Sequence, residues 1–168
     1  MKVLRYTLMG LAALLILVQF VPNELPEVAP ENPADLLKGD WVQADVAQLL
    51  KTSCYNCHSN ETDYPWYSYV APSSWLVARD VRKARKELNL STWTNLDVTD
   101  KLSKLDDISE EVGEGNMPLP IYTFMHPSAK LSEQQRQLIV QWTETAMDKL
   151  VEEEEAEEAV VEEEDTNN

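Results

Sequence analysis

The stretch Cys54-Tyr55-Asn56-Cys57-His58 (CYNCH) decides how the rest of this 168-residue chain is interpreted. Its two cysteines are the only two in the chain, and a histidine follows the second directly. Two thiols separated by two residues on one turn can each add to a vinyl group of a porphyrin, and the next histidine then lies under the iron. The motif predicts one covalent haem c, with Cys54 and Cys57 as thioethers and His58 as the proximal iron ligand.

Three other chemistries use closely spaced cysteines. A thioredoxin-like C-x-x-C requires a βαβ context that this sequence lacks, and a disulfide between the two thiols would close a very small, strained loop. A zinc site remains as an alternative, and its ligands would be Cys54, Cys57, His58 and His126, the other histidine of the chain. Because those four side chains would have to converge with none to spare, haem is the preferred interpretation.

Helical periodicity on both sides of the motif predicts an all-α domain over residues 40–150, built from about four short helices. No segment alternates with the period of two that a strand requires. The predicted helices cover residues 40–53, 73–88, 99–115 and 131–150. Their predicted caps are Asp40 with Gln43, Ser73 or Ser74, Thr99, and Ser132 with Gln135.

The segments outside this domain have distinct compositions. Residues 1–21 place Lys2 and Arg5 before an apolar run, which predicts an uncleaved signal anchor rather than a cleaved signal or a core helix. Residues 22–39 hold four prolines and four acids, which is typical of an extended tether. Residues 151–168 carry ten acids and no basic residue, and predict a disordered tail or a frayed helical extension. The formal charge of −16 disfavours nucleic acid as a partner.

Two blocks of the sequence resemble the small bacterial haem-binding domain family, relatives of cytochrome c with an N-terminal membrane anchor. They are CYNCHSNETDYPWYSYVAPSSWLVARDV, which begins at Cys54, and GNMPLPIYTFMHPSAKLSEQQRQLIVQW, which begins at Gly115. The resemblance extends over about Trp41 to Trp142 and implies a cytochrome c-like bundle around one haem. By analogy with that fold, a backbone carbonyl near Pro72 or Pro65 would accept the second ring N–H of His58.

The second block also contains the candidates for the other axial position of the iron. Met117 follows a helix-ending glycine and precedes Pro118, an arrangement in which the resemblance places the methionine ligand. His126 is the alternative ligand, and Met125 is expected to be core. A long aromatic loop needs something to pack on, so four aromatic residues are expected to line the haem pocket, namely Tyr64, Trp66, Tyr67 and Trp75.

These features predict a cytochrome tethered to the bacterial inner membrane, with its domain in the periplasm, that transfers single electrons through His/Met-ligated iron. No catalytic constellation is visible in the sequence, so an enzyme is not expected. The alternative is a haem-based sensor or peroxidase-like protein with a labile sixth ligand. The redox partner is not identified by the sequence. The basic run over residues 79–86 is expected to be a solvated helix face or a docking patch for an acidic partner or anionic lipid.

Overall fold

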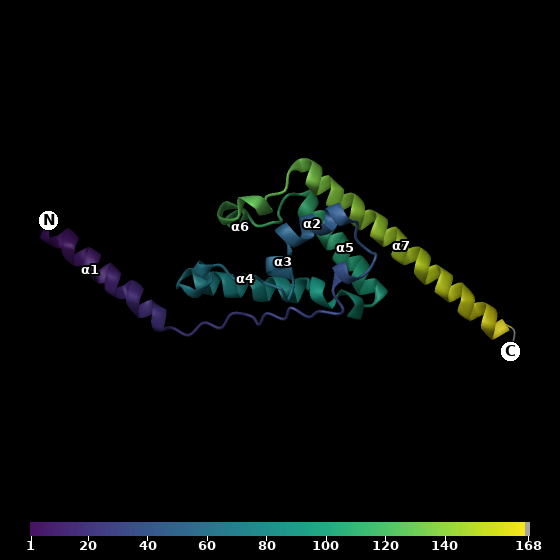
Figure 1. Cartoon of the computed structure of the whole chain (residues 1–168), viewed down its shortest axis with the longest axis horizontal. Helices are drawn as coiled ribbons and strands as arrows, with labels where there is room; N and C mark the ends of the chain where they lie inside the picture. The colour runs from purple at the N-terminus through teal and green to yellow at the C-terminus, as the bar shows by residue number, and fades with distance from the viewer. Residues whose placement is uncertain (167–168) are drawn as a thin grey trace.

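The computed structural model of the protein describes residues 1–166, and every regular element in that range is helical. The prediction of an all-α fold is therefore confirmed (Figure 1). The α-helices are α1 (Lys2–Leu17), α2 (Ala44–Ser53), α3 (Tyr55–His58), α4 (Ser73–Glu87), α5 (Val98–Gly113), α6 (Pro120–Met125) and α7 (Glu133–Thr166). The 3-10 turns are η1 (Val18–Phe20), η2 (Leu36–Lys38), η3 (Trp66–Tyr69), η4 (Leu90–Asn95) and η5 (Pro127–Ala129).

The four predicted helices correspond to α2, α4, α5 and α7, but only one of the predicted caps on them forms as expected. At the start of α7 the Ser132 N–H donates to Gln135 Oε1 at 2.8 Å, and the Gln135 N–H donates to Ser132 Oγ at 3.3 Å. The serine caps predicted for α4 are wrong, because the hydroxyl of Ser73 donates to two carbonyls of the preceding turn instead. The cap of α5 is Asp97, whose side chain accepts from the Asp100 N–H.

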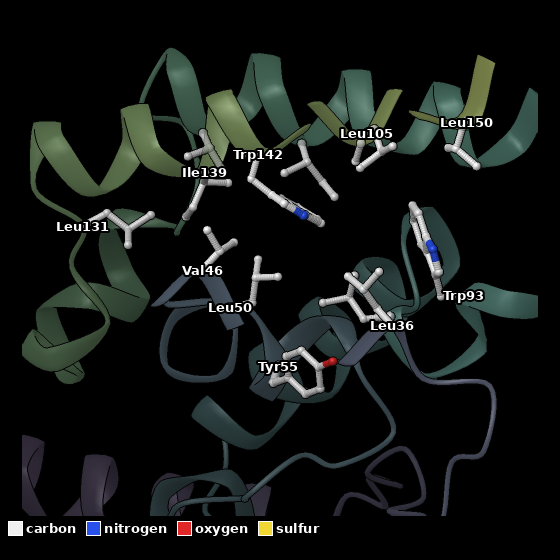
Figure 2. Close-up of a cluster of buried hydrophobic side chains, with 14 residues drawn as sticks. Leu36, Val46, Leu50, Tyr55, Trp93, Leu105, Leu131, Ile139, Trp142 and Leu150 are labelled. Atoms are coloured by element: carbon white, nitrogen blue, oxygen red, sulfur yellow. The ribbon is translucent and has the colours of Figure 1, made fainter. Parts of the chain in front are cut away.

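The hydrophobic core lies where α2 crosses the paired helices α5 and α7. Figure 2 shows Ile139 and Trp142 of α7 facing Val46 and Leu50 of α2. The Trp142 indole N–H donates to the carbonyl of Trp41 at 2.9 Å, which is one reason why α2 begins only at Ala44 and not after the predicted cap at Asp40. Each fully buried large apolar side chain contributes about 1.5–3 kcal/mol, so this crossing holds the segment that leads into Cys54.

The predicted tether over residues 22–39 is part of the folded domain. Leu36 is 1% exposed and belongs to the core, so the domain boundary predicted at residue 40 lies too late in the chain. The stretch before it runs extended beneath α4 (Figure 1). Arg82 of α4 donates to the carbonyl of Glu24, and Arg85 donates to the carbonyl of Glu27 at 2.7 Å. Two arginines of the predicted basic face therefore bind this segment.

The two ends of the chain form helices that project from the domain in opposite directions (Figure 1). None of the residues of α1 is buried, which contradicts a core helix, and residues 2–20 are long and apolar enough to cross a membrane. The acidic tail continues α7 to Thr166, so the helical alternative holds over that range and disorder does not. Glutamate and alanine favour helix, and the packed first half of α7 removes the cost of nucleation. Residues 167–168 of the predicted tail lie outside the described range.

Candidate haem-binding site

The CYNCH motif forms a single helical turn directly after α2. The carbonyl of Cys54 accepts the N–H of Cys57 at 3.1 Å and that of His58 at 2.9 Å. Both thiols and the imidazole therefore come from one turn, as attachment at two points with a ligand beneath the iron requires. Burial raises the pKa of the Cys54 thiol to about 12 and that of Cys57 to about 11, so both are protonated at neutral pH.

The imidazole of His58 is oriented by a backbone carbonyl at the end of α4. Its Nδ1 lies 3.1 Å from the carbonyl oxygen of Leu88, which leaves Nε2 available for a metal. Burial lowers the pKa of His58, although hydrogen bonding to Leu88 opposes that shift, and the neutral form is the one that binds iron. The prediction of an acceptor near Pro72 or Pro65 is wrong. The far end of α4 passes α3, and the last carbonyls of a helix have no partner within it.

The buried carboxylate of Asp35 is hydrogen-bonded to the turn formed by the CYNCH motif. Asp35 accepts from the hydroxyl of Tyr55, the second residue of the motif, at 2.7 Å and from the Ser91 hydroxyl at 3.2 Å. It also accepts from the Leu37 N–H at 2.9 Å. Asp35 and Ser91 were not predicted as site residues. The only signal in the sequence is an acid placed directly before two leucines in an otherwise proline-rich stretch.

An apolar cavity of about 520 Å³ lies beside the motif, between η3, the first half of α4 and α6. Such volumes are typical of cofactor sites. Its lining includes three of the four predicted aromatic residues, Tyr64, Trp66 and Tyr67, as well as Cys57 of the motif. Trp75 is not part of the lining. The residues of α4 that line the cavity are Ser73, Leu76, Val77, Arg79, Asp80 and Val81.

The cavity also contains a small polar cluster that includes His126. The His126 Nε2 lies 2.6 Å from the hydroxyl oxygen of Tyr67. The His126 ring stacks on Tyr122, with centroids 4.4 Å apart and planes inclined by 22°. The hydroxyl of Tyr122 accepts from the Asn56 amide at 2.9 Å, which connects α6 to the middle of the motif. Tyr122 and Asn56 were not predicted as site residues.

Met117 occupies a different place from His126. It is partly buried, and it packs against the same hydrophobic cluster as Cys54. Its N–H donates to the carbonyl of Glu111 at 3.0 Å, which closes the end of α5. The two predicted ligand candidates thus lie in different surroundings, since His126 lines the cavity together with Cys57 and Met117 does not. Met125 lines the cavity and is half exposed, so it is not the core residue that was expected.

The zinc alternative finds no support in residues 1–166. No three His, Cys, Asp or Glu side chains in that range lie close enough to share a metal ion, so the Cys2His2 set does not converge. Two thiols and a neutral imidazole on one turn, beside an apolar cavity, are instead a donor set that fits haem c.

Comparison with known proteins supports haem binding by this chain. Residues 13–145 match the family described as "Haem-binding domain". The chain is 28% identical over 97 residues to "Cytochrome c peroxidase Ccp" of Escherichia coli (strain K12), an alignment that covers 56% of this chain and 21% of that relative. The chain thus spans about a fifth of the length of the relative that it matches. No solved structure matches the chain. Because the family match covers most of the sequence, the chain belongs to the haem-binding domain family.

Proposed function

We propose that this haem-binding protein is a membrane-anchored c-type cytochrome of the periplasm that carries single electrons. The observation that supports it best is the CYNCH turn with Leu88 behind His58. When bound, haem supplies one iron that accepts and releases a single electron. The apolar helix α1 agrees with insertion in a membrane, and Lys2 and Arg5 at its start favour a cytoplasmic N-terminus.

The protein side chains would hold the haem in the following way. Each of the Cys54 and Cys57 thiols would add its S–H across a vinyl group of haem to form a thioether, and no other group would be released. His58 would keep its Nδ1 hydrogen-bonded to the Leu88 carbonyl and would offer Nε2 to the iron. The cavity is lined mainly by apolar surface, which would limit the access of water to the haem and so influence its reduction potential.

For the sixth position we propose Met117. Within residues 1–166 its thioether makes no hydrogen bond, and Met117 packs against the same core cluster as Cys54. The alternative ligand, His126, is already hydrogen-bonded through Nε2 to Tyr67. A methionine opposite histidine raises the reduction potential and suits electron transfer.

Covalent attachment is tested first, by producing the full chain together with a haem c maturation system. Haem should stay with the polypeptide through denaturation and acid–acetone extraction, and the Cys54→Ala/Cys57→Ala variant should lose it under the same conditions. Extraction of all haem from the unaltered protein would refute c-type attachment.

The sixth ligand is tested with Met117→Leu and His126→Gln, with Met125→Leu as the matched control thioether. Met117→Leu should abolish the thioether charge-transfer band of the oxidised protein and lower the reduction potential, whereas the other two variants keep the band. Loss of the native low-spin spectrum in His126→Gln alone would assign the position to His126.

A peroxidase-like or sensor function is the second candidate. The similarity to a cytochrome c peroxidase favours it, as does the Tyr67–His126 pair, which places a phenol and an imidazole inside the cavity. Such a function requires an open or labile sixth position. It would be supported if all three ligand variants left the spectrum unchanged and the protein consumed hydrogen peroxide at the expense of an electron donor. If the protein did not consume hydrogen peroxide, the electron-carrier function would be favoured.

A further inference from the structure

Most of the residues that line the cavity come from two segments that contain no charged residue, and the charged residues in its lining, Asp63, Arg79 and Asp80, lie just outside the first segment. Residues 64–78 and 115–129 lack Asp, Glu, Lys and Arg entirely, although 26% of the chain is charged. The first segment includes η3 and the start of α4, and the second includes α6. In a chain with this share of charged residues, two uncharged segments beside one cavity indicate a surface that contacts something other than water.

Large apolar side chains on these segments point away from the domain as well as into the cavity. Trp66 and Tyr69 of η3 are 74% and 67% exposed, and Ile121 and Phe124 of α6 are 67% and 79% exposed. We call these three aromatic residues and Ile121 the aromatic rim. Exposed aromatic residues at such density are typical of proteins that rest on a lipid–water interface, where the headgroups surround the rings.

The end of the membrane helix is bound to the same part of the domain. The Gln19 side chain donates to the carbonyl of Ala71 at 3.0 Å and accepts the Ala71 N–H at 2.9 Å. Asn23 donates to the carbonyl of Ser74 at 3.0 Å. A second cavity, of about 420 Å³, lies at this junction and is lined by residues of both segments, including Gln19 and Ala71. The turn that joins η3 to α4 is therefore held next to the last residues of the apolar helix.

The arrangement of the whole chain agrees with one orientation on a bilayer. In Figure 1, α6 and the start of α4 lie on the side of the domain that faces α1, whereas the acidic end of α7 lies at the opposite end of the molecule. With α1 across a membrane, the aromatic rim comes to the bilayer surface. The ten acids of the tail are then held far from the lipid headgroups.

We propose that the aromatic rim is a second membrane contact, so that the domain lies on the bilayer with η3 and α6 in the interface. Gln19 fixes this orientation through its two hydrogen bonds to Ala71. The partner that contacts the aromatic rim is the lipid surface, and the cavity that contains Cys57 lies beside the rim. This inference rests on the proposed insertion of α1, which the test below measures separately.

The chain offers a direct test because it contains only two phenylalanines, Phe20 at the end of the apolar helix and Phe124 on the rim. The haem-loaded full chain is labelled with 4-fluorophenylalanine and reconstituted into phosphatidylcholine–phosphatidylglycerol vesicles. Fluorine relaxation is measured before and after adding either a lipid spin-labelled near its headgroup or a water-soluble gadolinium chelate. The measurement without a probe subtracts the effect of the haem iron, and Phe124→Leu assigns the two signals.

Both signals should be relaxed by the spin-labelled lipid and protected from gadolinium. If Phe20 behaves in this way but Phe124 is relaxed by gadolinium alone, the rim is free in water, and the inference fails while the anchor stands. That outcome would leave the rim for a protein partner. If Phe20 is also relaxed by gadolinium alone, the proposed anchor itself fails. In Gln19→Leu, Phe124 should lose its lipid contact while Phe20 keeps it, and retention of contact by Phe124 would overturn the role given to Gln19.

Discussion

Replacing Asp35 with asparagine tests whether the segment before residue 40 is part of the haem domain. The side chain is 2% exposed and accepts hydrogen bonds from Tyr55, Leu37 and Ser91. Because Tyr55 lies between the two cysteines, the carboxylate connects the core to the turn that would carry haem. A simple tether would not depend on this residue.

The expected loss follows from the number and kind of these bonds. An amide of the same shape keeps one acceptor oxygen but replaces the other with an NH2 group, which cannot accept from a hydroxyl. One bond to a charged acceptor is lost, at about 1.5–3 kcal/mol, and the remaining bonds fall to the strength of neutral ones. We expect Asp35→Asn to lower the free energy of unfolding by about 2–4 kcal/mol, a large share of the roughly 5–15 kcal/mol typical of a domain.

The measurement is urea unfolding of the full chain in detergent, followed by far-ultraviolet circular dichroism. Asp40→Asn is the matched control, because Asp40 is exposed, and it should leave the midpoint unchanged. The yield of covalent haem gives a second readout, and it should fall in Asp35→Asn only. A midpoint for Asp35→Asn equal to that of Asp40→Asn would refute the placement of the boundary and the role of the carboxylate.

Three further predictions concern the core, a cap and the thiols. Trp142→Phe removes the N–H that donates to the Trp41 carbonyl and part of a buried ring. It should lower the free energy of unfolding, measured with heat or urea, by about 1–3 kcal/mol. A loss below about 0.5 kcal/mol would contradict the packing of Trp142 in the core. Ser132→Ala should cost about 0.5–2 kcal/mol by the same measurement, with little change for the exposed Ser128→Ala, and equal effects would argue against the cap. In protein made without haem, burial raises the pKa of the Cys57 thiol from 9.0 to about 11. At pH 8 the alkylation of Cys57 should therefore be about a hundredfold slower in the folded protein than in urea, and it should accelerate as the pH approaches 11. Equal alkylation rates in the folded and unfolded protein would contradict the burial of Cys57.

The helical class of the domain could be read from periodicity, because apolar residues at helical spacing record which face of a segment is buried. In α5, the apolar residues Leu102, Leu105, Ile108 and Val112 recur at helical spacing, and all of them are buried except Leu102, which is partly buried. Boundaries were less certain wherever a distant contact competed with a local cap, as at Trp41, whose carbonyl is bound by Trp142 across the core. The prolines of residues 22–39 indicated an extended chain but not the surface against which it packs.

For the site, spacing within a few residues was informative and contacts between distant segments were not. Three residues of one turn, Cys54, Cys57 and His58, have one spatial arrangement whatever the rest of the chain does. The acceptor for His58 depends on which end of α4 passes α3, and a helix presents free carbonyls only at its C-terminal end. Analogy placed the acceptor at the wrong end of the helix.

The sequence alone determined the chemistry that this protein can support, because covalent haem attachment requires only two thiols and a histidine on one short turn. It also determined the apolar and acidic character of the two ends, since composition alone decides whether a helix suits lipid or water. Only the tertiary structure decided that Leu88 orients the imidazole, that Asp35 supports the turn, and that two uncharged segments contribute to one cavity and form one rim. Those relations join residues far apart in the chain, and burial and hydrogen bonding between such residues are set by packing, which local spacing does not encode.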